Sequence, residues 1–163
     1  MLKRFFWVAV VTVFLAFQFS VGTASAVEVD ENIRTVKLNP QGDNIVLSNE
    51  EVQLGKRKFM YACAVCHKGG STRTNPNINL SLETLALAEP PRDNVEAIVD
   101  YIKNPTSYDG ELDISEIHPT TKRADLYPQM RNLTEEDLKA IAGHILMEPK
   151  VLGRMWGGGK VYN

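Results

Sequence analysis

The sequence predicts a mainly α-helical domain with one short β-hairpin near its N-terminus. Two segments open with a helix-capping signature, at Ser48 and at Thr134, and continue with apolar residues three or four positions apart. That spacing is typical of a helix that buries one face. Residues 27–47 are predicted to be extended, and the β-prone runs within them are too short to form a sheet core. We therefore expect helices around a single core, with the hairpin as an extension.

Residues 1–26 have the layout of a secretory signal peptide. Lys3 and Arg4 form a basic start, residues 5–19 are almost wholly apolar, and Ala24-Ser25-Ala26 supplies small residues for a signal peptidase. An uncleaved membrane anchor is the alternative, but the apolar run is shorter than the roughly 20 residues that span a bilayer. We expect cleavage after Ala26, which leaves residues 27–163 as one compact domain.

Removal of this segment makes the protein more acidic. It takes away two positive charges, so the formal net charge changes from −2 to −4. A mildly acidic exported protein is a poor nucleic-acid binder. Basic patches on a protein partner are the better complement.

The hairpin and the first long helix follow the predicted cleavage point. Residues 34–38 and 44–47 are β-prone and flank a turn-forming segment, Asn39 to Asp43. Ser48 and Glu51 then form a capping box for a helix that runs toward residue 62. Gly55 lies on its apolar stripe, where it is either a tolerated defect or the point at which another helix crosses closely. We favour the crossing.

The remaining elements are a loop, two more helices and a tail. Residues 68–91 are rich in turn formers and read as loop. A helix is predicted over Val95–Lys103, capped by Asp93 or Asn94, and the last helix should run from Thr134 to Glu148-Pro149. The tail, residues 150–163, contains three consecutive glycines, so it is either flexible or docked on something else, and we favour the flexible alternative.

The motif Cys63-Ala64-Val65-Cys66-His67 is the strongest chemical signal in the chain. C-x-x-C-H is the attachment signature of c-type haem. The two thiols, Cys63 and Cys66, form thioether bonds with the haem vinyl groups, and His67 follows at once as an axial ligand of the iron. The motif therefore predicts one covalently bound haem c, its anchors and its first axial ligand.

Other roles for two nearby cysteines are weaker. A redox-active dithiol would require a βαβ setting, and a zinc site would require more thiolates than the two that the chain contains. A structural disulfide at this spacing would close a strained ring. Capture as thioethers also explains why an exported chain has only two cysteines, placed together.

The second axial ligand must come from the remaining histidines and methionines. Met60 is too close to Cys63, and Met147 and Met155 lie beyond the stripe of the last helix. We interpret His144 as a half-exposed histidine on the flank of that helix. This leaves His118, in a loop stiffened by Pro119, and Met130, which could equally be a core methionine. The residues alone favour His118 only modestly.

Several longer stretches resemble the photosystem II cytochrome c-550 (PsbV) family. They include P-P-R-D-N, N-P-T-S-Y-D-G, I-H-P-T and W-G-G-G-K-V-Y, and the match covers nearly the whole mature chain. The chain also resembles monohaem c-type cytochromes generally, in Gly55-x-x-x-Phe59 before the motif and in its closing helix. In those folds the first and last helices cross, which implies a close approach at Gly55, with Gly143 as a candidate partner. The resemblance implies a c-type cytochrome fold around one covalent haem.

The family resemblance also implies the second ligand and a cellular role. The histidine of the I-H-P segment is His118, and Tyr127-Pro128 stands where related carriers have a Met-Pro ligand. Bis-histidine ligation implies a comparatively low potential. The implied role is an extrinsic subunit on the lumenal face of photosystem II in the thylakoid of a cyanobacterium or alga. It would help retain calcium and chloride at the oxygen-evolving manganese cluster.

Two functional classes remain open at this point. The first is a docked structural subunit that contacts photosystem II core subunits and other extrinsic subunits, with peripheral membrane association through those contacts. The second is a soluble electron-transfer cytochrome with a small, dissociable contact surface. The hairpin and the tail favour docking, because they are extensions that could serve as contacts. An enzyme with a small-molecule substrate is disfavoured, since two axial ligands leave no open site on the iron.

Overall fold

The computed structural model describes residues 29–158, so the predicted signal segment and residues 159–163 lie outside the described chain. The helices and strands are α2 (Glu31–Arg34), β1 (Thr35–Lys37), β2 (Asn44–Val46), α3 (Asn49–Ala62), α4 (Ala64–His67), α5 (Leu82–Ala86), α6 (Val95–Lys103) and α7 (Glu135–Leu152). Short 3₁₀ turns, η1 to η4, span Lys68–Gly70, Thr121–Arg123, Pro128–Met130 and Gly153–Met155. Within the described range, every helix is too short or too polar to cross a bilayer.

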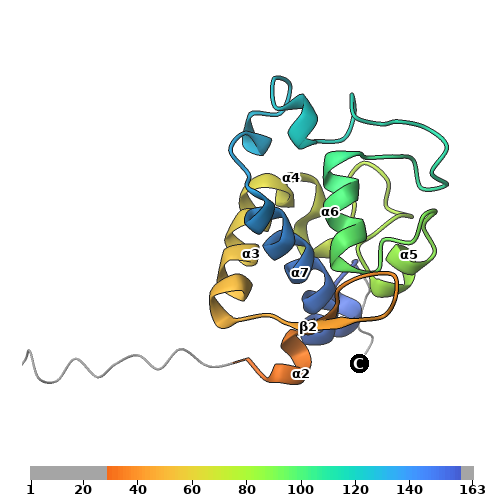
Figure 1. Ribbon diagram of the computed structural model, residues 1–163. Coiled ribbons are helices and arrows are strands. Elements are labelled where there is room, and N and C mark those ends of the chain that lie inside the picture. Colours follow the sequence, from red (N-terminus) through yellow and green to blue (C-terminus); the bar gives the residue numbers. More distant parts are fainter. Residues whose placement is uncertain (1–28, 159–163) are drawn as a thin grey trace, which may run out of the picture.

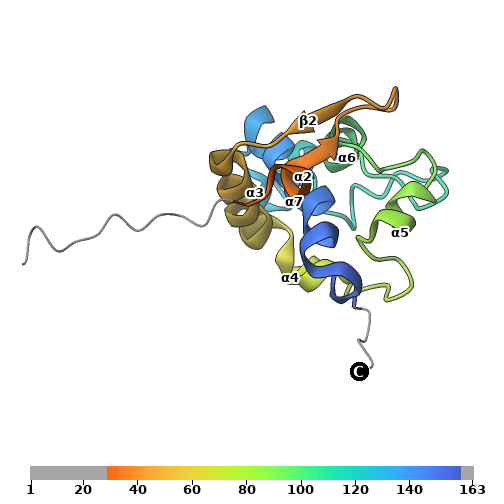
Figure 2. The same cartoon turned by 90° about the horizontal axis from the view of Figure 1, so that it is seen from below.

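The fold is mainly α, as predicted, and α7 is its central element. Helices α3 and α6 both pack against α7 (Figure 1). The hairpin lies at one end of these helices, and the long loop after α6 lies at the other end. Viewed from below, the hairpin and α4 are on opposite sides of α7 (Figure 2).

The predicted boundaries of α3 and α6 are confirmed. The Ser48 side chain accepts a hydrogen bond from the Glu51 backbone, and the Glu51 carboxylate accepts one from the Ser48 backbone. The Asn94 side chain caps α6 by accepting from the Ala97 backbone. These caps satisfy backbone donors that the first turn of a helix leaves unpaired.

Helices α3 and α7 cross at Gly55, which confirms the predicted close approach. A Cβ added at Gly55 would lie 2.1 Å from the backbone oxygen of Ala140. The suggested partner, Gly143, is wrong: it faces the Leu47 side chain, whose terminal carbons would be 2.9 Å from an added Cβ. The absence of a side chain at Gly55 therefore lets the α7 backbone approach, and its absence at Gly143 leaves room for the Leu47 side chain.

The hairpin is confirmed, but it is not a mere appendage. Strands β1 and β2 pair antiparallel, with Val36 opposite Ile45. Val36 and Leu47 are 3% and 4% exposed and belong to the main hydrophobic core. The preceding segment was predicted to be extended, yet residues 31–34 form a helical turn capped by Asp30. Burial of alternate apolar residues thus makes the hairpin part of the core.

The C-terminal region differs from the prediction in two respects. Helix α7 continues through Pro149 to Leu152, because the Gly153 backbone donates to the Pro149 carbonyl and closes the turn after the proline. The tail that follows is docked up to residue 158: Trp156 is 5% exposed and lies in the core. The expected flexibility of this tail is therefore wrong for residues 150–158, and its last five residues lie outside the described chain.

Candidate functional site

The two cysteines and His67 lie in one tight turn at the end of α3. Cys63 is the C-cap of α3, and the backbone amides of Cys66 and His67 both donate to the Cys63 carbonyl. Both thiols are free and half-buried. Burial, and then the nearby Cys66, raises the pKa of the Cys63 thiol to about 12. An uncharged sulfur such as a thioether therefore suits this position.

The local contacts of His67 fix which ring nitrogen is available. The Thr72 hydroxyl lies 3.2 Å from Nδ1 of His67. Burial lowers the pKa of His67, against an opposing hydrogen bond with the backbone at Ser71, so the ring is neutral at neutral pH. With Nδ1 engaged by Thr72, Nε2 is the nitrogen that remains for a metal ion, in the usual arrangement of a ligand histidine.

His118 reaches the same site from a segment 51 positions further along the chain. The centres of the His67 and His118 rings are 6.1 Å apart, and the ring planes are inclined by 48°. Metal–imidazole bonds are about 2 Å long, so two rings bound to one metal ion from opposite sides have centres about 6 Å apart. The observed spacing fits an iron atom between the two rings.

Burial also keeps the His118 ring neutral. Burial, followed by the neighbouring His67, lowers the pKa of His118 to about 4. Its Nδ1 atom is buried with no hydrogen-bond partner in the described chain. Two neutral imidazoles with ring centres 6.1 Å apart are suitable nitrogen donors for a haem iron between them.

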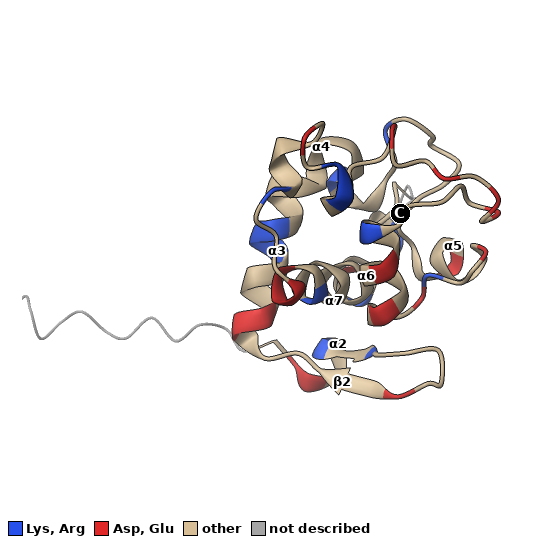
Figure 3. Ribbon diagram, turned by 45° about the horizontal axis from the view of Figure 1, so that its top comes forward, with Lys and Arg blue, Asp and Glu red and all other residues tan. Residues whose placement is uncertain are grey.

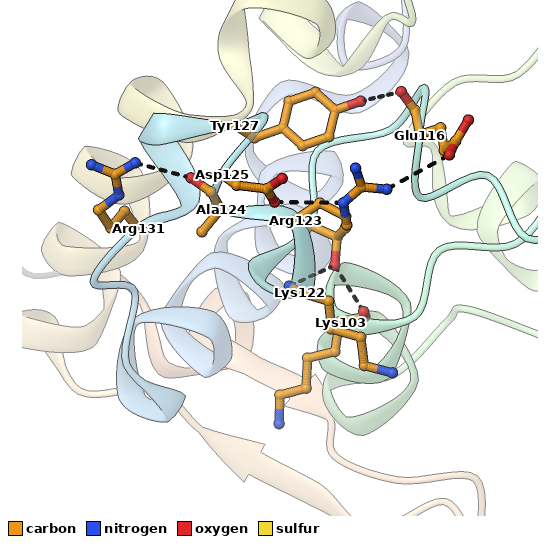
Figure 4. A network of polar contacts seen from close by, with 9 residues as sticks. Lys103, Glu116, Lys122, Arg123, Ala124, Asp125, Tyr127 and Arg131 are labelled. Atoms are coloured by element: carbon orange, nitrogen blue, oxygen red, sulfur yellow. Dashed lines mark hydrogen bonds and ion pairs between the residues drawn. The ribbon is translucent and has the colours of Figure 1, made fainter.

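Hydrogen bonds on both sides of His118 hold its loop in place (Figure 4). The His118 backbone donates to the Ile114 carbonyl. Tyr127 donates its hydroxyl hydrogen to the Glu116 carbonyl, at 2.7 Å. The Thr120 hydroxyl, fully buried, donates to the Lys103 carbonyl at the end of α6, at 2.8 Å. The ligand segment is thus tied to α6 and to the loop that leads to η3.

The other ligand candidates occupy the core or the surface. Met130 is 3% exposed and is a core methionine in η3. Met147 is also 3% exposed, so its placement beyond the buried stripe of α7 is wrong. His144, expected to be half-exposed, is only 4% exposed, and its ring centre is 4.9 Å from that of Phe59. Because α7 is covered on several sides, a position off its main stripe is still buried.

Trp156 connects the tail to the segment that follows His67. Its indole nitrogen donates to the Leu80 carbonyl at 2.8 Å, and a Cβ added at Gly70 would lie 2.6 Å from its ring. The Gly157 backbone donates to the Gly69 carbonyl at 2.8 Å. The sequence analysis missed this contact, although an aromatic residue before a glycine run was a usable signal.

The sequence analysis also missed the side chains that surround His118. The Tyr101 ring is 5.0 Å from the His118 ring, edge to face, and the Arg92 guanidinium lies 4.0 Å above Tyr101. Arg92 is only 8% exposed. It lies in P-P-R-D-N, one of the stretches that carry the resemblance to the cytochrome c-550 family.

The model of the cytochrome c-550 domain family matches residues 27–163 of this chain. Among curated proteins, photosystem II extrinsic protein V of Synechococcus elongatus is 57% identical over 161 residues, which are 99% of this chain and 96% of that protein. The protein of the same name from Nostoc punctiforme is 59% identical over 162 residues, 99% of each chain.

Two solved structures are also similar. A crystal structure of cytochrome c549 has a TM-score of 0.77 and 56% identity, and the match covers 78% of this chain and 99% of that one. The PsbV2 cytochrome of Thermosynechococcus elongatus has a TM-score of 0.63 and 32% identity, covering 76% and 87% of the two chains.

Proposed function

This chain belongs to the cytochrome c-550 family, whose members carry a covalently bound c-type haem, and on that premise we propose that it is an extrinsic haem subunit of photosystem II. Its place would be the lumenal face of the thylakoid membrane in a cyanobacterium or alga. There it would stabilise the oxygen-evolving cluster and its retention of calcium and chloride. The names of its relatives, which are photosystem II extrinsic proteins, support this proposal.

Four residues would hold the haem. Cys63 and Cys66 would form the thioethers, and His67 and His118 would be the axial ligands. The single observation that carries the ligand assignment is the 6.1 Å separation of the two imidazole rings. When bound, the haem supplies reversible one-electron chemistry of the iron. The chain itself contributes two neutral nitrogen donors and a buried setting.

This ligand set argues for a low potential and against catalysis. Two imidazoles lack the thioether ligand that raises the potential of many c-type cytochromes. With both axial positions filled by the protein, the iron has no free position for a substrate. The relatives are not named as enzymes, and we propose that this protein is not one either.

A further contact surface can be proposed beside the hairpin and the tail, on which the sequence-based hypothesis relied. Val36 and Trp156 point into the core of the domain, so neither is available to a partner. Exposed acidic residues recur along the loop between α6 and η2, at Asp109, Glu111, Asp113 and Glu116 (Figure 3). They support the expectation that a protein partner is basic.

The ligand assignment is tested by the spectrum of the purified oxidised protein. The wild type should lack a methionine-to-iron charge-transfer band, and His118→Met should acquire one together with a higher midpoint potential. Met130→Leu is the matched control and should leave the spectrum unchanged. A band in the wild type that disappears in Met130→Leu would show that methionine is the ligand.

The location is tested by washing thylakoid membranes with increasing salt. An extrinsic subunit should stay with the membranes at low salt, and its release at high salt should reduce oxygen evolution until calcium and chloride are supplied. A soluble electron carrier would instead appear in the low-salt supernatant, and its loss would leave oxygen evolution intact.

A further inference from the structure

Arg92 is a buried cation whose partners are uncharged. It is 8% exposed, and its terminal nitrogen donates to the Thr106 carbonyl and hydroxyl, each at 3.2 Å, and to the Ser107 carbonyl at 2.7 Å. Within residues 29–158 it has no ion pair with a carboxylate. Burying a charge without a charged partner costs free energy. A buried arginine of this kind therefore points to a functional role.

The first consequence concerns the loop that carries His118. Arg92 donates its hydrogen bonds to Thr106 and Ser107, at the start of this loop. Thr106 in turn forms a β-bridge with Asp113, and the next residue, Ile114, accepts the backbone hydrogen bond of His118. Hydrogen bonds therefore connect the guanidinium to the histidine through the loop backbone.

The second consequence is electrostatic and runs through Tyr101. The guanidinium is 4.0 Å above the Tyr101 ring, and that ring meets His118 edge to face at 5.0 Å. These distances place the positive charge within about 9 Å of the His118 ring, close enough to act through a poorly screening interior. Tyr101 lies on α6, a rigid helix, so the stack also limits rotation of the imidazole.

We propose that Arg92, stacked on Tyr101, is the residue that positions His118 on the haem iron and raises the haem potential with its buried charge. This inference rests on the proposed role of His118 as an axial ligand. The sign follows from electrostatics: oxidation adds one positive charge to the iron, and a nearby cation opposes it. Outer groups of this kind commonly orient a ligand and tune the metal that it binds.

Two variants of the holoprotein separate the effect of the Arg92 charge from the effect of its contacts with the loop and with Tyr101. Arg92→Gln removes the charge and should lower the midpoint potential, changing the reduction equilibrium about tenfold, which is about 59 mV for one electron. Arg92→Lys keeps the charge but loses the planar guanidinium that stacks on Tyr101 and donates to Thr106 and Ser107, so its potential should stay near that of the wild type. In both variants, added imidazole or cyanide should displace His118 faster than in the wild type.

Two control variants define what would overturn the inference. Arg131→Gln removes an exposed arginine, and solvent screening should leave both readouts unchanged. Tyr101→Phe keeps the stack and should also behave as the wild type, whereas Tyr101→Leu should show faster ligand exchange. A potential that is the same in Arg92→Gln and Arg131→Gln, or wild-type ligand exchange in both Arg92 variants, would refute the proposal.

Failure of this inference can be told apart from failure of the proposed ligation. If the wild-type spectrum shows methionine ligation, the assignment of His118 is wrong and Arg92 loses its role with it. If the wild type shows two histidine ligands but the Arg92 variants behave as Arg131→Gln does, only the present inference fails. Should Arg92→Gln not fold, Arg92→Lys and Tyr101→Leu still test, through the rate of ligand exchange, whether Arg92 and Tyr101 hold His118 in position.

Discussion

The two sides of the haem site are built in different ways. On the proximal side, Cys63, Cys66 and His67 fall within one turn of chain, and hydrogen bonds to the Cys63 carbonyl shape that turn. On the distal side, His118 is held by a loop whose anchors, Arg92 and the carbonyl of Lys103, come from elsewhere in the sequence. The proximal half is thus a local structure, and the distal half is a tertiary one. Removing His67 and removing His118 should therefore affect the surrounding structure to different degrees.

Removal of each histidine gives the largest expected contrast. His118→Ala should release the distal loop, and amide hydrogen exchange in residues 105–120 should accelerate by at least about tenfold, which corresponds to 1.4 kcal/mol. His67→Ala should not accelerate exchange in residues 63–70 comparably, because two thioethers would still hold that segment. Equal acceleration on both sides, measured by mass spectrometry, would remove the distinction.

The proximal side depends on the crossing of α3 and α7. Gly55→Ala forces a methyl group against the backbone oxygen of Ala140 and should destabilise the fold by about 3 kcal/mol. Gly143→Ala is the matched control, since its methyl group meets only the flexible end of Leu47. It gains about 1 kcal/mol in helix propensity, so its net effect should be small. Chemical denaturation of both variants measures the difference, and similar losses would contradict the backbone contact.

The distal side should be sensitive at Thr120. Thr120→Val leaves the Lys103 carbonyl without its buried donor and should cost about 1–3 kcal/mol. Thr120→Ser keeps the hydroxyl and should retain most of the stability. Faster imidazole binding in Thr120→Val than in Thr120→Ser would link this contact to His118, whereas equal rates would confine its role to the fold.

The smallest effect concerns acid stability and the ion pair between α3 and α7. Asp137 accepts from the Thr134 backbone and lies 3.0 Å from the Lys58 amine. Burial alone would raise the pKa of Asp137, but these contacts lower it below its unfolded value of about 3.9. Its contribution is therefore present above that value and lost as the pH falls through the folded pKa.

Asp137→Asn should accordingly cost about 1 kcal/mol at neutral pH, and the difference from the wild type should vanish in strong acid. Glu136→Gln changes an exposed acid in the same turn and should leave the pH profile unaltered. Thermal unfolding between about pH 2 and pH 7 distinguishes the two variants. A difference that persists at the lowest pH would contradict this account.

Local signals predicted most of the secondary structure and half of the site. The capping boxes at Ser48 and Thr134 and the cap at Asn94 placed three helices, because each involves only neighbouring residues. These local signals did not predict the burial of side chains at places where segments distant in the sequence meet. His144, Met147 and Trp156 were expected at the periphery, yet each is buried because α7 and the tail are covered by segments remote in sequence.

The sequence by itself determined the covalent attachment motif and predicted the first ligand, since these need only the spacing of Cys63, Cys66 and His67 along one turn. It favoured His118 over Met130 as the second ligand only modestly, and family resemblance strengthened the choice of His118. The tertiary structure brought the His118 ring to 6.1 Å from the His67 ring and placed Met130 in the core. It also brought Arg92 and Tyr101 beside the distal histidine. The physical reason is that opposite faces of a haem must be reached by chain segments whose meeting depends on packing, which no local pattern encodes.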